Sequence, residues 1–282
     1  MTYPLNLACK HGCPIGVIKL LINSGADLNR REDGGYSPIE YSYLMDRFQT
    51  FELLLESGAY LENHSWFAFT IMRDKKFEYL KLLVESGFNL DELLMNAVSF
   101  ARHDTIKYLI SAGADVNYGE WDKPLAYAIS SHYNKSTRKQ SLKSVKILLE
   151  AGADPNLYGE LGYPLSMAAD EGREDIIDML LEYGAKINDE HGFSYALTLA
   201  SSNHDCLKIV EKLLNLGASV NGTTKTESPL FSAIQSGNID IVKLLLDHGA
   251  DVRHKIKRRG TVMDLAFKLG HVEMIKLMGE YV

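Results

Sequence analysis

The sequence predicts an all-α repeat solenoid, a fold in which short helix-turn-helix units stack side by side. The first observation is a set of glycines that close apolar runs at successive spacings of 33, 29, 26, 39, 32, 33 and 32. The second is a proline-containing motif that lies upstream of most of these glycines. A period of this length is typical of stacked repeats. The glycines are Gly25, Gly58, Gly87, Gly113, Gly152, Gly184, Gly217 and Gly249.

The upstream motif predicts where the first helix of each unit begins. Proline at the first helical position loses no hydrogen bond and presets φ, and a preceding Ser or Thr can cap the free amides. The apolar run that follows predicts a second helix, which the glycine ends in the left-handed conformation. The motif copies are YPLNLA from Tyr3, SPIEYS from Ser37, KPLAYA from Lys123, YPLSMA from Tyr163, SPLFSA from Ser228 and TVMDLA from Thr261.

The two features together follow the pattern T-P-L-H-x-A and then V-x-L-L-x-x-G-A-D-V-N. The best copies are GYPLSMAADEGREDIIDMLLEYGAKIN and SPLFSAIQSGNIDIVKLLLDHGADV. On these motifs the whole chain resembles the ankyrin repeat family. The resemblance implies stacked helix-turn-helix repeats with short β-hairpin fingers, and an activity that consists of holding another protein.

We predict a single ankyrin repeat domain of about nine repeats over residues 1–282. No domain boundary is needed, because each repeat of a stacked array contacts only its neighbours. The predicted repeats are 1–28 as the N-terminal cap, 29–61, 62–90, 91–116, 117–155 with an insertion between its helices, 156–187, 188–220, 221–252, and 253–282 as the C-terminal cap.

Repeats three and four depart from the pattern, since the steps to Gly87 and Gly113 are the two shortest in the series. We expect their fingers to be shortened or absent, with Asp91 as the cap of the next helix. The aromatic segment Trp66–Ile71 stands in place of the proline motif. Either its aromatic side chains fill the core in place of a finger, or they join Leu44, Met45 and Phe100 in an apolar surface that binds a partner.

Repeat five carries the one large insertion, because the step from Gly113 to Gly152 is the longest in the series. We assign the extra length to a polar loop between the helices, HYNKSTRKQSLKS. Five Lys or Arg and no acidic residue lie between positions 132 and 149. This loop is either simply solvated or a docking loop for an acidic partner. Trp121, in the finger before it, is a candidate interface anchor.

Repeat six reverses the sign of the charge. Residues 150–190 hold eleven Asp or Glu against Arg173 and Lys186, a net charge of −9 beside −7 for the whole chain. By the family's register, Asp170 and Glu171 lie at the groove-facing end of the first helix, with Tyr163 on the adjacent finger. An acidic groove with tyrosines favours a basic protein segment as the ligand.

Composition sets limits on compartment and partner. No stretch has the roughly 18 apolar residues of a membrane span, and we predict a cytoplasmic protein without membrane association. Three cysteines form no disulfide framework. The run KIKRR before Gly260 could be read as a nucleic-acid patch, but the net charge of −7 argues against nucleic acid as the main partner.

Motifs for catalysis are missing from the sequence. No phosphate-binding glycine loop, G-x-G-x-x-G, H-E-x-x-H or G-x-S-x-G occurs. The clusters Cys9–Cys13 and His204–Cys206 lack a second half at zinc-site spacing. Adjacent acids such as Asp170 and Glu171 point in different directions on a helix. We expect no enzyme, no catalytic or metal site, no cofactor and no small-molecule substrate.

The sequence therefore predicts a non-catalytic protein-protein interaction module that scaffolds or blocks its partner. The alternative is an inhibitor or effector that shuts off one enzyme or host protein by tight one-to-one binding. The resemblance also implies a third role, as a substrate for asparagine hydroxylation at Asn117, Asn156 and Asn221. The predicted partner-binding residues are Tyr36, Leu44, Met45, Arg73, Asp74, Phe100, Trp121, Ser130, Tyr163, Asp170, Glu171, Asn203, Gln235 and Ser236.

Overall fold

The fold is described by a computed structural model in which helices predominate. Two compact units make up the chain, residues 1–96 and residues 97–282. The structure describes residues 3–33, 35–61, 64–74, 76–119, 123–130, 137–159, 162–189, 194–221, 228–256 and 260–281.

In the first unit, helices follow one another in pairs joined by short turns. The unit boundary falls within the seventh helix. The helices are α1 (Pro4–His11), α2 (Ile15–Asn23), α3 (Pro38–Leu44), α4 (Phe48–Glu56), α5 (His64–Asp74), α6 (Phe77–Glu85) and α7 (Leu90–Ser99).

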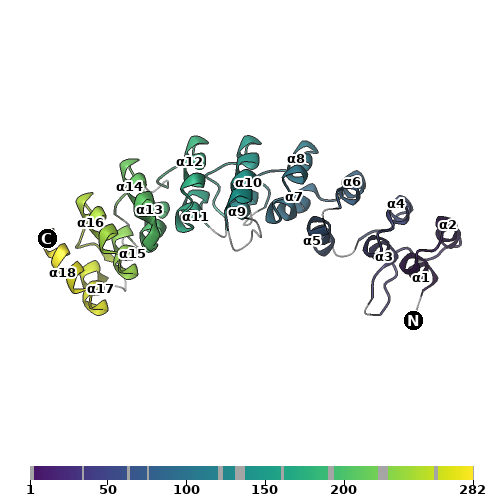
Figure 1. The fold of residues 1–282 in the computed structure, drawn as a ribbon, viewed down its shortest axis with the longest axis horizontal. Helices are drawn as coiled ribbons and strands as arrows, with labels where there is room; N and C mark the ends of the chain where they lie inside the picture. Colours follow the sequence, from purple (N-terminus) through teal and green to yellow (C-terminus); the bar gives the residue numbers. More distant parts are fainter. Residues whose placement is uncertain are drawn as a thin grey trace. The chain divides into compact units, whose positions relative to one another are not determined.

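The second unit continues the same alternation. We call the first helix of each pair the inner helix and the second the outer helix. Figure 1 shows the inner helices α9, α11, α13 and α15 in one row and the outer helices α10, α12, α14 and α16 in another. The helices are α8 (His103–Ser111), α9 (Pro124–Ile129), α10 (Arg138–Glu150), α11 (Pro164–Asp170), α12 (Glu174–Glu182), α13 (Tyr195–Ser202), the 3-10 turn η1 (His204–Cys206), α14 (Leu207–Asn215), α15 (Pro229–Ser236), α16 (Ile239–Asp247), α17 (Val262–Leu269) and α18 (Val272–Gly279).

The inner helices begin as the motif predicts. Proline occupies the first turn of α1, α3, α9, α11 and α15. Ser37 and Thr261 each form a capping box, in which the hydroxyl accepts the amide of a residue three positions on and that residue's carboxylate accepts the Ser or Thr amide. Ser228 caps α15 through its hydroxyl alone. These caps satisfy amides that a helix start would leave without partners.

The outer helices end in one repeated motif. At each of the eight turn glycines φ lies between 80° and 104°, the left-handed region that glycine enters without steric cost. At Gly184, for example, the glycine amide donates to Leu181 O at 3.1 Å and the Ala185 amide donates to Leu180 O at 2.9 Å. This pair of bonds is the Schellman motif, and it satisfies the last helical carbonyls. The predicted role of the glycines is confirmed.

Asparagines after the turns join each repeat to the next. Asn156 Nδ2 donates to Gly184 O at 3.0 Å, and its Oδ1 accepts the Lys186 amide at 2.8 Å. Asn117, Asn188 and Asn221 each make the corresponding two bonds to the turn of the next repeat. In the first unit, Asn29 Oδ1 accepts the Tyr60 amide at 2.8 Å.

Strand pairing is sparse among the described residues. Strands β1 (Lys255–Ile256) and β2 (Gly260–Thr261) pair antiparallel, and Gly159 forms a single bridge with Gly162. Between α6 and α7 the chain turns within a few residues, as expected for the shortened fingers. The expected cap is wrong: Asn89, not Asp91, accepts the amides of Asp91 and Glu92, because its side chain precedes the first helical turn.

An aromatic core occupies the irregular part of the first unit. The Tyr43 and Phe67 ring centroids lie 4.7 Å apart, Tyr43 and Tyr79 5.0 Å, and Phe51 stacks on Phe67 at 5.8 Å. All four side chains are buried. Lys76 Nζ lies 4.6 Å from the Tyr43 ring centroid. These contacts favour the interpretation in which aromatic side chains fill the core where a finger is short; the Trp66 side chain lies outside the described part.

The insertion in repeat five is partly helical, which differs from the predicted polar loop. Helix α10 begins at Arg138, so the second half of HYNKSTRKQSLKS is helix and not loop. Thr137 caps it, accepting the Gln140 amide while Gln140 Oε1 accepts the Thr137 amide. The sequence T-R-K-Q is a capping box followed by helix-forming residues, which explains the longer helix. Residues 131–136 lie outside the described part.

We expect different effects on stability from two glycine-to-alanine substitutions. Gly184→Ala places a Cβ at φ 88° and should lower the free energy of unfolding by about 1–2 kcal/mol. Gly279→Ala lies in helix α18 with open space around the added methyl, and should be neutral or stabilising by up to about 1 kcal/mol. Urea unfolding of both variants measures the difference. Equal effects would mean that the left-handed turn does not constrain the fold.

Candidate functional site

The acidic residues of repeat six divide between its two helices. Asp170 is the last residue of inner helix α11 and is exposed, and Glu171 follows it half-buried. The Asp170 carbonyl accepts Nδ2 of Asn203 at 3.0 Å, and the Glu171 carbonyl accepts a guanidinium nitrogen of Arg138 at 3.5 Å. The backbone carbonyls of Asp170 and Glu171 thus bind side chains of the two neighbouring repeats. The two residues themselves lie at the end of the inner helix.

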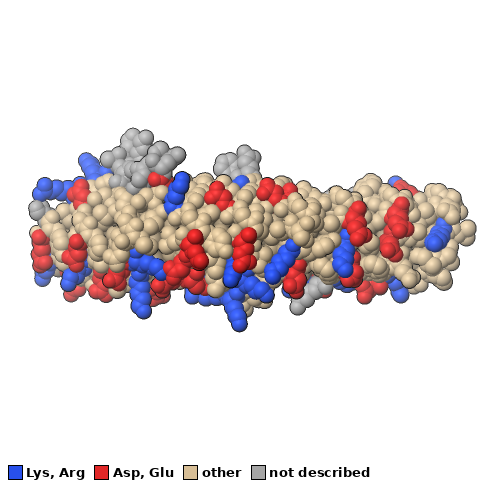
Figure 2. Space-filling view, turned by 90° about the horizontal axis from the view of Figure 1, so that it is seen from above, with Lys and Arg blue, Asp and Glu red and all other residues tan. Residues whose placement is uncertain are grey.

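Several acidic side chains on the outer helices of this region form ion pairs. Lys212 of α14 pairs with Glu174 at 3.5 Å and with Asp178, both on α12. Glu150 at the end of α10 pairs with Lys146 at 3.8 Å. Figure 2 looks onto the outer-helix side and shows blue and red side chains interspersed along it. The local charge of −9 from the sequence count is therefore spread over two faces of the unit and does not sit on one surface.

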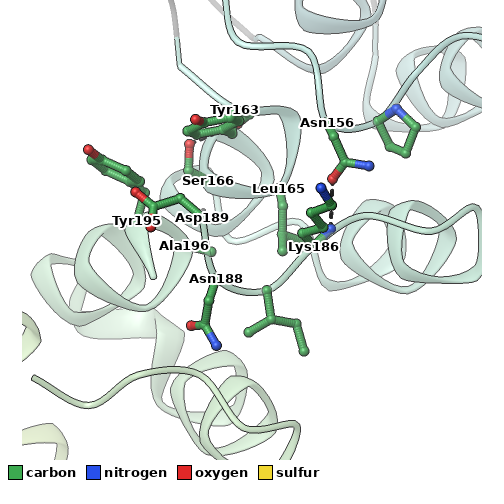
Figure 3. Close-up of a pocket in the computed structure, with 11 residues that line it drawn as sticks. Asn156, Tyr163, Leu165, Ser166, Lys186, Asn188, Asp189, Tyr195 and Ala196 are labelled. Atoms are coloured by element: carbon green, nitrogen blue, oxygen red, sulfur yellow. Dashed lines mark hydrogen bonds between the residues drawn. The ribbon is translucent and has the colours of Figure 1, made fainter. Parts of the chain in front are cut away.

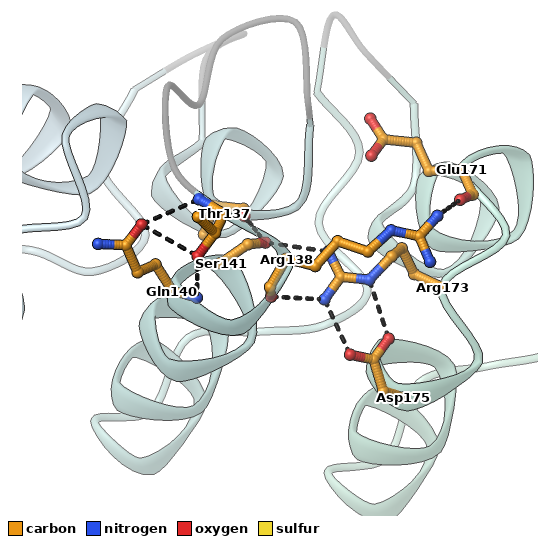
Figure 4. A network of polar contacts seen from close by, with 8 residues as sticks. Thr137, Arg138, Gln140, Ser141, Glu171, Arg173 and Asp175 are labelled. Atoms are coloured by element: carbon orange, nitrogen blue, oxygen red, sulfur yellow. Dashed lines mark hydrogen bonds and ion pairs between the residues drawn. The ribbon is translucent and has the colours of Figure 1, made fainter.

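A buried arginine joins repeats five and six. Arg173 is 3% exposed, and its Nε and one terminal nitrogen each donate to a different oxygen of Asp175 at 2.9 Å. It also donates to the Arg138 carbonyl at 3.0 Å and to the Ser141 hydroxyl at 3.4 Å (Figure 4). The two hydrogen bonds that Arg173 donates to the Asp175 carboxylate hold the pKa of Asp175 below its usual value. Arg173 is thus a structural residue in an acidic repeat.

The predicted residues of repeats seven and eight serve partly as links between repeats. Asn203 follows α13 and, besides its bond to Asp170, accepts the Asp205 amide at 3.1 Å. The Ser236 hydroxyl donates to Ala233 O at 3.0 Å and lies 3.4 Å from Ser201 O in the preceding repeat. Gln235 is exposed next to Ser236. Gln235 is therefore more accessible than the two residues whose side chains bind backbone.

Tyrosines gather where the fingers meet the inner helices of repeats six and seven. The Tyr163 ring centroid lies 5.0 Å from that of Tyr158 and 5.7 Å from that of Tyr195. Tyr158 is 55% exposed and Tyr195 38%. Tyr163 and Tyr195 line a pocket of about 180 Å³ together with Ser166, Asn188 and Asp189 (Figure 3). We call this the tyrosine pocket.

The sequence prediction included Tyr163 but not Tyr195 or Asp189. Tyr195 opens an inner helix that lacks the proline, so the motif that drew attention to Tyr163 was missing there. A signal was nevertheless present, because Tyr195 follows Tyr163 by one repeat length. Residues one repeat apart lie side by side in stacked units.

In the first unit, the predicted site residues are placed at the ends of helices α3 and α5. Met45 is 43% exposed after α3, and Leu44 is half-buried. Arg73 Nε donates to Asp74 Oδ1 at 2.8 Å, and Asp74 Oδ2 accepts the Tyr43 hydroxyl at 3.2 Å. The Arg73 hydrogen bond is the main reason that the pKa of Asp74 lies below its usual value.

Tyr36 lies apart from these residues. It is exposed before α3, with its ring centroid 5.6 Å from the ring of Tyr41. The structure thus leaves Tyr36 and Met45 at the surface, whereas Asp74 has a structural role besides any contact with a partner.

Three further predicted binding residues lie in or next to repeat five. Ser130 follows the end of α9 at Ile129 and is 4% exposed, so its side chain offers a partner little surface. Phe100 is half-buried, with the Arg102 guanidinium 5.7 Å from its ring centroid. Trp121 lies outside the described residues.

Metal-binding clusters or reactive cysteines would indicate chemistry in the described part of the chain. No cluster of three or more His, Cys, Asp or Glu with the geometry of a metal site is found there. Burial raises the pKa of the Cys9 thiol to about 12 and also raises that of Cys206, which disfavours the reactive thiolate. Within the same residues, no helix is both long and apolar enough to cross a membrane.

Family comparison settles the fold. The model of ankyrin repeats in three copies matches residues 68–159, 134–224 and 197–281, and a single ankyrin repeat model matches residues 3–30. The chain belongs to the ankyrin repeat family. The crystal structure of the human ASB11 ankyrin repeat domain superposes with a TM-score of 0.50 at 23% identity, covering 94% of this chain and 92% of that one. This likeness supports the all-α repeat solenoid.

Curated relatives of the ankyrin chain are longer proteins. It is 31% identical over 220 residues to a putative palmitoyltransferase ZDHHC13 of Danio rerio, which covers 73% of this chain and 33% of the relative. It is 29% identical over 131 residues to human ankyrin repeat and SOCS box protein 11, 45% of this chain and 40% of the relative. The ankyrin chain thus matches less than half the length of either. Ankyrin repeats are protein-interaction modules, and that coarse function extends to this member of the family.

We expect Arg173→Met to destabilise the second unit by about 2–4 kcal/mol, because the Arg138 carbonyl and the Ser141 hydroxyl lose a buried partner. Methionine keeps most of the side-chain volume, so lost packing contributes little. Lys208→Met on α14, where the lysine is exposed, is the matched control and should change stability by less than about 0.5 kcal/mol. Similar unfolding midpoints for the two variants would contradict the structural role of Arg173.

Proposed function

We propose that this ankyrin repeat chain is a non-catalytic module that binds a basic segment of a partner protein. The proposed contact surface is the inner-helix side of repeats six to eight, from the tyrosine pocket to Asp170, Glu171, Gln235 and Ser236. The single observation that carries the proposal is the separation of charge between the two helices of repeat six. The acids Glu174, Asp175 and Asp178 belong to outer helix α12, whereas Asp170 is an exposed residue at the end of inner helix α11.

Electrostatics favours a cationic ligand for this surface. Exposed carboxylates steer an oppositely charged partner toward the surface and repel wrong ones. Of the acidic residues between positions 150 and 190, Asp170 and Glu171 lie at the end of inner helix α11. The neighbouring inner-helix surface also presents tyrosine side chains. Tyrosine supplies a large contact area with few rotatable bonds, so little side-chain entropy is lost on binding.

The same proposal holds that the chain binds its partner without catalysing a reaction. Asp170 and Glu171 are consecutive, and adjacent helical side chains diverge, which is poor geometry for shared acid-base work. The raised pKa values of Cys9 and Cys206 oppose a role as nucleophile. The palmitoyltransferase named among the relatives shares 33% of its length with this chain, so its activity is not carried over.

Charge reversal tests the proposed surface. Asp170→Lys with Glu171→Lys should lose the partner that co-purifies with the wild-type chain from its native cell, as measured by quantitative mass spectrometry. The matched control is Glu182→Lys with Glu211→Lys, which changes the net charge equally but on the outer helices α12 and α14. It should retain the partner.

Two results would contradict the proposal. If both double variants lose the partner equally, net charge and not the inner-helix surface determines binding. If neither loses it, the apolar residues near Met45 become the better candidate. Circular dichroism and thermal unfolding of each variant establish that the fold is intact before the binding results are compared.

A further inference from the structure

The tyrosine pocket is built by two neighbouring repeats at the same level of their inner helices. Tyr163 is the residue before α11 and Tyr195 is the first residue of α13. Their ring centroids are 5.7 Å apart with planes inclined by 39°, and Tyr158 adds a third ring 5.0 Å from Tyr163. The inner helices α11 and α13 pack against each other, so packing within the fold fixes the position of both lining tyrosines.

The electrostatic character of the pocket differs from one side to the other. Figure 3 shows Tyr163, Tyr195 and Asp189 on one side, with Asn156 and Lys186 on the other. Aromatic ring faces carry negative potential and attract cations, which a nearby carboxylate reinforces. Burial and then the charge of Asp189 raise the pKa of Tyr195, so its phenol remains neutral near pH 7. The tyrosine side of the pocket therefore suits a cation, and the Lys186 side does not.

The size of the pocket limits what can enter it. Sites for drug-sized ligands and cofactors measure about 300–1,000 Å³, whereas this pocket has about 180 Å³. One side-chain head group fits this space better than a whole cofactor. Backbone contacts of a larger ligand would then lie on the surface outside the pocket.

Distances along α11 connect the pocket with the acidic end of the helix. Tyr163 and Asp170 are seven positions apart, which is close to two helical turns, and so they lie on the same side of the helix. Helix α11 has 7 residues, which span about 10 Å. A peptide in the polyproline II conformation advances about 3.1 Å per residue and has three residues per turn, so side chains three positions apart lie on the same side, about 9 Å from each other. Two such side chains therefore match the separation of the two sites.

We propose that the tyrosine pocket binds the guanidinium or ammonium group of an arginine or lysine in the partner segment, held over Tyr163 and Tyr195 beside Asp189. A second cationic side chain, three positions away on a partner segment in the polyproline II conformation, then faces Asp170 and Glu171. This inference rests on the proposed function and specifies the residue type and spacing that the surface recognises.

A peptide titration tests the inference on the whole chain. The probe is the fluorescein-labelled peptide GSGRGGRGSG, followed by fluorescence anisotropy, and the reference is the same peptide with citrulline in place of both arginines. Citrulline keeps the shape of arginine but lacks its charge, and a carbonyl oxygen replaces two of the five N–H donors. We expect the arginine peptide to bind at least tenfold more tightly than the citrulline peptide. The variant GSGRRGGGSG, with adjacent arginines, should bind several-fold more weakly than the spaced peptide.

Paired protein variants separate a cation site from a general effect of the tyrosines. Tyr163→Leu with Tyr195→Leu should weaken binding of the arginine peptide about tenfold, because two ring faces are removed. Tyr163→Phe with Tyr195→Phe keeps the ring faces and should stay within about threefold of wild type. Tyr60→Leu with Tyr183→Leu, at exposed tyrosines outside the pocket, is the matched control and should bind like wild type.

The outcomes distinguish this inference from the proposed function. If the leucine variant binds like wild type while Asp170→Lys with Glu171→Lys weakens binding, the pocket is not the cation site but the acidic surface stands. If wild type binds arginine and citrulline peptides equally, the inference is overturned whatever partner co-purifies. A leucine variant that unfolds is replaced by Asp189→Asn, for which unchanged affinity would also overturn the inference.

Discussion

The rest of the structure depends on contacts between adjacent repeats. A single helix pair cannot bury its apolar side alone, so each repeat covers the next. Within the second unit, asparagine side chains at the turns add two hydrogen bonds to each step, as between Asn156 and the backbone of Gly184 and Lys186. The asparagines can act this way only because the glycine turn presents that carbonyl at the same place in every repeat. The proposed hydroxylation of Asn117, Asn156 and Asn221 would thus act on side chains that already hold two backbone groups.

Where the repeat shortens, different interactions take over. In the first unit, the aromatic side chains of Tyr43, Phe51, Phe67 and Tyr79 pack together where repeats two and three meet. Lys76 adds an ion pair with Asp46 at 2.8 Å as well as its contact with the Tyr43 ring. Phe67 belongs to the aromatic segment that the sequence offered either as core or as a partner site, and in the structure it is a core residue. Met45, at 43% exposed, remains at the surface of this unit.

The repeat-level features could be predicted because they are local and periodic. Proline starts, glycine ends and apolar runs depend on a few neighbouring residues, and each recurs several times. Features that depend on particular side chains across repeats could not be predicted. Arg173 resembled one of two isolated cations in an acidic repeat, yet it is buried by contacts with residues more than thirty positions earlier.

The predicted site differs from the structure for the same reason. The family register placed Ser130 on the groove-facing side, whereas in the structure it is 4% exposed. Tyr195 was missed because its helix lacks the proline motif, although it lies one repeat after Tyr163. Charge counting along the sequence could not separate the inner from the outer helices. That separation follows from the helix bounds in the structure, where α11 ends at Asp170 and α12 begins at Glu174.

The central claim is that ligands bind the inner-helix side of the second unit, and hydrogen-deuterium exchange of the whole chain tests it most directly. Exchange is compared for the free chain and for the chain saturated with the arginine peptide. The account predicts slower exchange in residues 162–171 and 194–203, with no change in residues 38–61. Slower exchange confined to the first unit, near Met45 and Asp74, would contradict the account.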